Sequence, residues 1–140
     1  GGHKKDLFAI WAAHRPAYVA TVIATEPVDL ARKIEKAKGL KGSRLIIALS
    51  PCPTGWDFDP QETVEIGRLA VKTGMWPLKE YENGKVIHTR VPAQRAPVEE
   101  YLVKQGRFAH LFKPQRNEAL LAEIQAGVDD YWAEAEADHD

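Results

Sequence analysis

The chain has 140 residues, of which 44% are hydrophobic and 28% are charged, and its formal net charge is −1. This composition is typical of one ordinary globular domain and argues against a disordered chain. It supplies no basic field for nucleic acid, and no apolar run reaches the roughly 18 residues that a membrane helix needs. The single cysteine, Cys52, excludes an internal disulfide. A lone cysteine and no recognisable signal peptide predict a cytoplasmic protein. The charge and the short apolar runs predict that it has no nucleic-acid or membrane partner.

The first half of the chain alternates between helical and strand patterns. Asp6 is a candidate cap for a first helix. The apolar stripe of that helix comprises Leu7, Ile10, Trp11 and His14. Residues 18–24 are apolar and β-branched, which indicates a strand, and Pro27 then opens a second helix that ends at Gly39. The inward face of the second helix comprises Leu30, Ile34 and Ala37. Residues 44–49 form another apolar run and indicate a second strand.

The second half contains a third helix, a hairpin and two further helices. The run Asp59-Pro60-Gln61-Glu62 is a capping signal with proline at the first helical position, and the helix ends at Gly74. Its apolar face comprises Ile66, Leu69, Ala70 and Thr73. Asn83-Gly84 is the strongest short hairpin signal, and it lies between strand patterns at 78–81 and 85–89. Helical patterns follow near residues 98–105 and 116–135.

This order predicts an α/β fold, an open parallel sheet flanked by helices and followed by a hairpin and C-terminal helices. Both early strand patterns are apolar without alternation, so we expect them to be buried on both faces. Two such strands cannot satisfy their edges alone, and the chain opens with Gly1-Gly2-His3 and no initiator Met. We therefore expect residues 1–75 to be the later part of a larger α/β domain. Residues 76–140 would extend it, packing on that domain or on a partner subunit.

Cys52 directly follows the second predicted strand, in the run Leu-Ser-Pro-Cys-Pro-Thr-Gly-Trp at 49–56. In open α/β sheets, ligands bind at the carboxyl ends of strands. Pro51 and Pro53 stiffen the loop, because each fixes its own φ angle and restricts the residue before it. The residues alone leave two interpretations open: a small buried thiol, which is the commoner case for a lone cysteine, or a functional one.

The remaining candidates give weaker signals. The histidines show no metal-ligand spacing; they are His3, His14, His88, His110 and His139. His14 is expected to end the first helix and His88 to lie on the exposed face of the hairpin. Nucleophilic catalysis by Cys52 would need one of these histidines beside it.

Aromatic residues near the loop and at the end of the chain are expected to pack. We expect Trp56 and Phe58 to be packed and Asp59 to cap a helix. In segment 105–108, Gly106 can end a helix, or Arg107 can contact another subunit through its hydrogen-bonding fork. Tyr131 and Trp132 are expected in the core or at a subunit interface.

Four segments, taken together, point to a known family. They are Ala13-His14 with 16–21, Leu49–Trp56, Gly74–Leu78 with 80–84, and Pro97–Leu102 with 105–108. In this order they resemble the C-terminal portion of the thiamine-diphosphate-binding (beta) subunit of the pyruvate/2-oxoacid:ferredoxin oxidoreductases. The resemblance runs from about Lys5 to about Leu111. One departure is Arg15, where the family pattern has the glycine of an Ala-His-Gly turn. This departure bears on the local geometry of that turn and not on the family.

The resemblance implies a subunit of an enzyme, a CoA-acylating 2-oxoacid:acceptor oxidoreductase. Such an enzyme oxidatively decarboxylates a 2-oxoacid to an acyl-CoA with thiamine diphosphate and passes electrons through a [4Fe-4S] cluster. It implies that Cys52 is one cluster ligand, while residues upstream of this chain bind thiamine diphosphate and Mg²⁺ and supply the other ligands. The implied partners are other subunits, a 2-oxoacid, CoA, and ferredoxin or a similar electron acceptor. No residue of this chain is expected to be catalytic.

Two questions stay open at this level. The substrate can be pyruvate, a branched-chain 2-oxoacid, an aryl 2-oxoacid such as phenylglyoxylate, or an oxalate-type acid, because such relatives share this subunit. The alternative of a different class is a non-catalytic structural or docking module of a multisubunit complex, in which Cys52 is inert.

Overall fold

The computed structural model describes residues 4–138, which form a mixed α/β structure. The α/β class predicted from the sequence is confirmed. The elements in chain order are α1 (Leu7–Ala13), β1 (Tyr18–Ile23), α2 (Pro27–Gly39), β2 (Arg44–Leu49), α3 (Pro53–Trp56), the 3-10 helix η1 (Pro60–Glu62), α4 (Thr63–Lys72), β3 (Leu78–Glu82), β4 (Lys85–Arg90), α5 (Val98–Leu102), the 3-10 helix η2 (Gly106–Leu111) and α6 (Glu118–Ala137). The short helix α3, in the segment expected to be a loop, and the 3-10 helix η2 have no counterparts among the predicted elements, and α5 ends at Leu102 rather than near residue 105.

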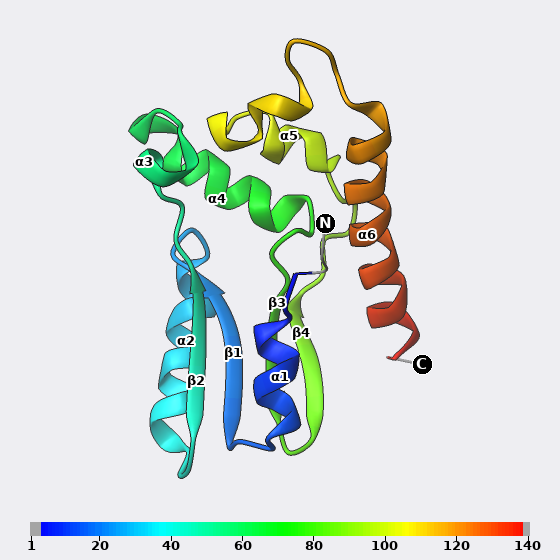
Figure 1. Cartoon of the computed structure of the whole chain (residues 1–140). Coiled ribbons are helices and arrows are strands. Elements are labelled where there is room, and N and C mark those ends of the chain that lie inside the picture. Colours follow the sequence, from blue (N-terminus) through cyan, green and yellow to red (C-terminus); the bar gives the residue numbers. More distant parts are fainter. Residues whose placement is uncertain (1–3, 139–140) are drawn as a thin grey trace. The chain divides into compact units, whose positions relative to one another are not determined.

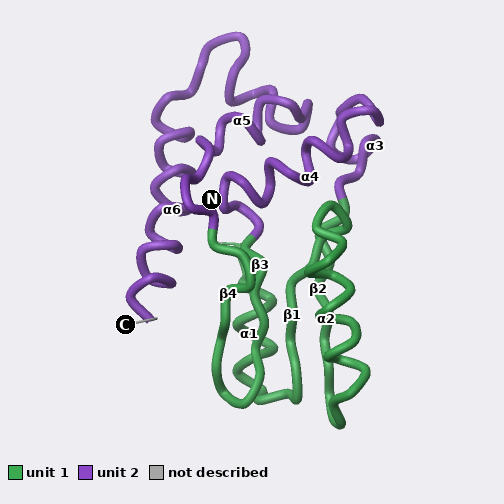
Figure 2. The backbone as a smooth tube through the Cα atoms, turned by 180° about the vertical axis from the view of Figure 1, so that it is seen from behind, with its two compact units in different colours: residues 1–50, 77–91 green, residues 51–76, 92–140 purple. Residues whose placement is uncertain are grey.

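The chain divides into two compact units (Figure 2). The first contains the residues up to 50 together with 77–91, and the second contains 51–76 with the residues from 92 onward. These units do not coincide with the segments 1–75 and 76–140 expected from the sequence. The hairpin belongs to the first unit, because β3 pairs with β1.

The first unit is built on a four-stranded sheet with the order β2-β1-β3-β4 (Figure 1). β1 and β2 run parallel, in a register from Tyr18 opposite Arg44 to Ile23 opposite Leu49. β3 is antiparallel to both β1 and β4, so the hairpin extends the same sheet. Its turn places Asn83 at φ 53° and Gly84 at φ 78°, the two positive φ angles that a type I′ turn requires. The predicted Asn-Gly hairpin is therefore confirmed.

The central strand β1 is buried on both faces, as its apolar pattern predicts. On one face, Val19 packs with Phe8 of α1 and Tyr81 of β3. On the other face, Tyr18 and Ala20 pack with Ala37 of α2. The same prediction is wrong for β2, whose residues are half-buried or exposed. As an edge strand, β2 has β1 as its one neighbour in the sheet.

The expected inward faces of the first two helices are partly wrong. In α1 the buried residue is Phe8, whereas Leu7, Ile10 and Trp11 are 48%, 47% and 41% exposed. Phe8 and Ala12, one turn apart, form the face that packs on the sheet. In α2, Ala37 is buried as predicted, but Ile34 is 38% exposed and the buried neighbour is Lys33.

Charged groups are buried between α2 and the sheet, and each has hydrogen-bond partners. Lys33 Nζ donates to the carbonyl oxygen of Thr21 at 2.9 Å and to Asp29 Oδ2 at 2.6 Å. Burial lowers the pKa of Lys33, although Asp29 acts in the opposite direction. Glu80 accepts from Tyr18 Oη at 2.6 Å and from Lys36 Nζ at 2.9 Å.

Burial by itself raises the pKa of Glu80, but the hydrogen bonds from Tyr18 and Lys36 outweigh it and leave that pKa below its ordinary value. Burial, together with the bond to Glu80, raises the pKa of Tyr18. The ionised form of Glu80 therefore contributes to the stability of the first unit, and this contribution is lost as pH falls through its folded pKa.

The second unit has its own helical core. The buried face of α4 includes the residues predicted for it: Ile66, Leu69, Ala70 and, at its C-cap, Thr73. Trp132 of α6 is 1% exposed, and its indole N–H donates to the carbonyl oxygen of Gly74 at 3.0 Å. Trp132 therefore lies in the core, with the half-buried Tyr131 packed edge-to-face on it. No helix within residues 4–138 is long and apolar enough to cross a membrane.

Candidate functional site

Cys52 lies where the chain leaves β2 and enters the short helix α3. It is the N-cap of α3, with Pro53 at the first helical position. Its Sγ accepts a hydrogen bond from the backbone N–H of Gly55 at 3.3 Å. The thiol is free and exposed. Within the described residues, Cys52 is therefore exposed, unlike the small buried hydrophobe that a lone cysteine most often is.

Two backbone hydrogen bonds close the cysteine loop, residues 50–58. The N–H of Trp56 donates to the carbonyl oxygen of Cys52 at 2.9 Å, and that of Phe58 to the carbonyl oxygen of Pro53 at 3.1 Å. Asp57, the C-cap of α3, has φ 57°, which a residue with a side chain seldom adopts. A four-residue helix cannot be stable alone, so contacts from elsewhere must hold it.

Those contacts come from segment 105–108. The N–H of Gly106 donates to the carbonyl oxygen of Asp57 at 2.7 Å. A Cβ atom on Gly106 would lie 1.9 Å from Asp57 Oδ2, so glycine is needed here for close approach. The interpretation of Gly106 as a helix end is wrong, because α5 ends at Leu102 and Gly106 begins η2. A glycine in the run Gln-Gly-Arg-Phe was the sequence signal, but its partner Asp57 could not be found from spacing.

Arg107 stacks on the aromatic side chain of the cysteine loop. Its guanidinium carbon lies 3.9 Å from the ring centroid of Trp56 and 4.5 Å from that of Phe108. Trp56 also meets Phe58 and Tyr101 edge-to-face, with centroids 6.3 and 6.5 Å apart. The expected packing of Trp56 and Phe58 is confirmed. So is the cap by Asp59, whose Oδ1 accepts from the N–H of Gln61 at 2.9 Å.

The histidines do not complete a site at Cys52. His14 is the exposed C-cap of α1, as expected, and His110 is exposed in η2. His88 is half-buried in β4, so the expectation that it lies on the exposed face is only partly met. His3 and His139 lie outside the described residues. Among residues 4–138, no histidine is hydrogen-bonded to Cys52 Sγ, and no group of three or more His, Cys, Asp or Glu side chains could hold a metal ion.

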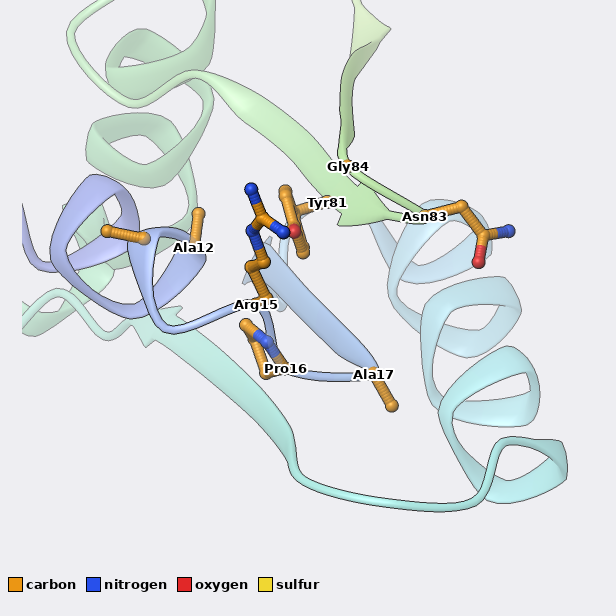
Figure 3. A pocket seen from close by; sticks show the side chains of 8 residues that line it. Ala12, Arg15, Pro16, Ala17, Tyr81, Asn83 and Gly84 are labelled. Carbon is orange, nitrogen blue, oxygen red and sulfur yellow. The ribbon is translucent and has the colours of Figure 1, made fainter.

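A surface hollow of about 680 Å³ lies in the first unit (Figure 3). Arg15, Pro16 and Ala17 line it from the α1–β1 turn, and Tyr81 with Asn83 and Gly84 from the hairpin. Arg15 has φ 52°, the left-handed conformation that glycine adopts most easily. The turn therefore keeps the geometry expected of a glycine although arginine occupies it, and Figure 3 shows that side chain beside Tyr81.

No protein-family model matches the chain, but curated relatives do. Pyruvate synthase subunit PorB of Methanosarcina barkeri is 47% identical over 126 residues, which cover 90% of this chain and 43% of the relative. PorB of Methanocaldococcus jannaschii is 51% identical over 108 residues, covering 77% and 36%. Ketoisovalerate oxidoreductase subunit VorB of Pyrococcus abyssi is 45% identical over 113 residues, covering 79% and 36%.

The chain thus spans 36–43% of the length of these relatives. Both names denote subunits of 2-oxoacid oxidoreductases, so the family resemblance identified from the sequence is confirmed. Over 77–90% of its length, this chain is similar to part of the 2-oxoacid oxidoreductase subunits named pyruvate synthase PorB and ketoisovalerate oxidoreductase VorB.

Proposed function

We propose that this chain is part of a subunit of an enzyme that oxidatively decarboxylates a 2-oxoacid to an acyl-CoA. When bound, thiamine diphosphate supplies carbanion stabilisation and a [4Fe-4S] cluster supplies a one-electron acceptor. Residues outside this chain would hold thiamine diphosphate and Mg²⁺, and residues 1–75 would be part of the domain that binds them. The partners would be other subunits, CoA, and ferredoxin or a similar acceptor, in the cytoplasm.

The observation that carries this proposal is the exposed Cys52, which lies in a loop between β2 and α3 that segment 105–108 contacts. A thiolate is the ligand that iron–sulfur clusters use. The N–H of Gly55 points at Cys52 Sγ, and such N–H···S bonds tune the potential of a cluster. The residues present therefore fit one ligand of a cluster. Since residues 4–138 hold no metal-ligand group of three, the other ligands would come from elsewhere in the assembly.

The names of the relatives bear on the substrate class. The relatives are named for pyruvate and for ketoisovalerate, which are both 2-oxoacids with aliphatic side chains. We propose an aliphatic 2-oxoacid as the substrate, with an aryl 2-oxoacid such as phenylglyoxylate as the alternative. Comparing acyl-CoA formation from pyruvate, ketoisovalerate and phenylglyoxylate by the assembled enzyme separates these substrates.

The experiment that tests the role of Cys52 is Cys52→Ser in the assembled enzyme. A hydroxyl is a harder and poorer ligand for iron than a thiolate, so the cluster should be lost or converted while thiamine diphosphate still binds. Iron content and electron paramagnetic resonance measure the outcome. Ser50→Ala is the control, because Ser50 is an exposed neighbour in the same loop. Full iron content and parent spectra in Cys52→Ser would exclude ligation and favour a non-catalytic docking module.

A further inference from the structure

The contacts around the cysteine loop assign a further residue to this site. We propose that Arg107 is a positioning residue that holds α3, and through it the Cys52 sulfur, in place. This inference rests on the proposed role of Cys52 as a cluster ligand. Arg107 does not itself touch the reacting groups; it acts through the indole of Trp56.

The first step is that α3 depends on Trp56. The helix contains a single turn, with Cys52 at its beginning and Trp56 at its end, joined by the hydrogen bond from the Trp56 N–H to the Cys52 carbonyl oxygen. Trp56 is wedged between Phe58 and Tyr101 on its edges, with the guanidinium of Arg107 over its face. A displaced indole would therefore move the turn that fixes Cys52.

The second step is that Arg107 is itself oriented. Its Nε donates to Gln105 Oε1 at 2.7 Å, while Gln105 Nε2 donates to the carbonyl oxygen of Tyr101 at 2.7 Å. Gln105 is 1% exposed, and both polar atoms of its buried amide are hydrogen-bonded. The bond to the Tyr101 carbonyl oxygen fixes the amide, and the amide oxygen then orients the guanidinium of Arg107. Within residues 4–138 no carboxylate pairs with Arg107. Its partners besides Gln105 are the ring faces of Trp56 and Phe108 and the hydroxyl of Tyr101, to which Nη2 donates a long hydrogen bond of 3.5 Å.

The third step is that arginine suits this position better than lysine. A guanidinium is planar and can stack on an indole while its Nε stays bonded to an amide oxygen. An ammonium group can sit over the ring, but it is a compact point charge without that fork. Lysine should therefore retain part of the effect and alanine none of it.

The test uses the assembled enzyme with Arg107→Ala and Arg107→Lys. The readouts are the rate at which a chelator removes cluster iron, the paramagnetic resonance spectrum of the reduced cluster and its midpoint potential. We expect iron release at least tenfold faster in Arg107→Ala, which corresponds to about 1.4 kcal/mol. The g values and the potential should change as well. Arg107→Lys should fall between Arg107→Ala and the parent enzyme.

Arg68→Ala is the matched control, since Arg68 is an exposed arginine of α4 in the same unit. It should leave all three readouts unchanged. If Arg107→Ala does not assemble, the Arg107→Lys enzyme carries the test by the same three measurements. Parent release rates, spectra and potential in the Arg107 variants would overturn this inference alone, provided that Cys52→Ser has lost the cluster. A cluster retained in Cys52→Ser would instead overturn the proposed function.

Discussion

Gly74 offers a sharp test of the packing in the second unit, because two independent features of the structure oppose any side chain there. Its φ angle is 77°, and a Cβ atom would lie 2.3 Å from Trp132 Nε1 and 2.8 Å from Arg95 Cδ. The arginine stem can move aside. Trp132 is 1% exposed and hydrogen-bonded to Gly74 itself, so it cannot yield without breaking that bond.

The expected loss for Gly74→Ala is the sum of two terms. The left-handed backbone costs about 1–2 kcal/mol for a residue with a Cβ atom. Overpacking a core adds about 1–3 kcal/mol. The free energy of unfolding should therefore fall by about 2–5 kcal/mol. With a urea dependence of about 2 kcal/mol per molar, the midpoint should fall by about 1 M or more.

Gly127→Ala is the matched control, because the same substitution there should raise the free energy of unfolding instead of lowering it. Gly127 lies within α6 with nothing within 4 Å of an added Cβ, so alanine should raise helix stability by about 1 kcal/mol. Urea unfolding followed by tryptophan fluorescence measures both variants at one protein concentration, since association would shift the midpoints. Equal midpoints for the parent and Gly74→Ala would refute the close approach of Trp132 to Gly74.

Two further changes test the first unit. Arg15→Gly should raise the free energy of unfolding by about 0.5–1 kcal/mol, because glycine relieves the positive φ but gains freedom in the unfolded chain; a lower urea midpoint would mean that the arginine side chain stabilises the hollow it lines. For Glu80, whose folded pKa lies below the ordinary value of 4.5, the stabilisation is present above that value and is lost as pH falls through the folded pKa. Glu80→Gln should therefore flatten the fall in urea midpoint between pH 7 and acid pH, and an equally steep fall in both proteins would contradict the role of Glu80.

Local patterns predicted much of this protein well. The strand at Arg44–Leu49, the Asn83-Gly84 turn and the cap by Asp59 are all as expected, because each depends on residues that are neighbours in the chain. The place of Cys52 directly after a strand is likewise a local property. Its proposed role came from a family resemblance, which the relatives support at the level of the family.

Which side of an element faces inward depended on the tertiary structure. In α1, the spacing predicted that Leu7, Ile10 and Trp11 face inward, but the residue that packs on the sheet is Phe8. A seven-residue helix has apolar residues on more than one face, so periodicity cannot choose among them. The burial of Lys33 was hidden for a related reason: a lysine is expected to be exposed unless its partners, here Asp29 and the Thr21 carbonyl oxygen, are already in place.

The arrangement that holds the cysteine loop was also decided in three dimensions. Gly106 and Arg107 are about fifty residues from Asp57 and Trp56 in the sequence, yet they are in direct contact with them. Sequence patterns report the periods of single helices and strands, whereas such contacts form only when the whole chain has packed. The sequence therefore determined most of the longer elements and the position of the thiol, whereas the tertiary structure decided the short helices α3 and η2 and which side chains hold that thiol in place.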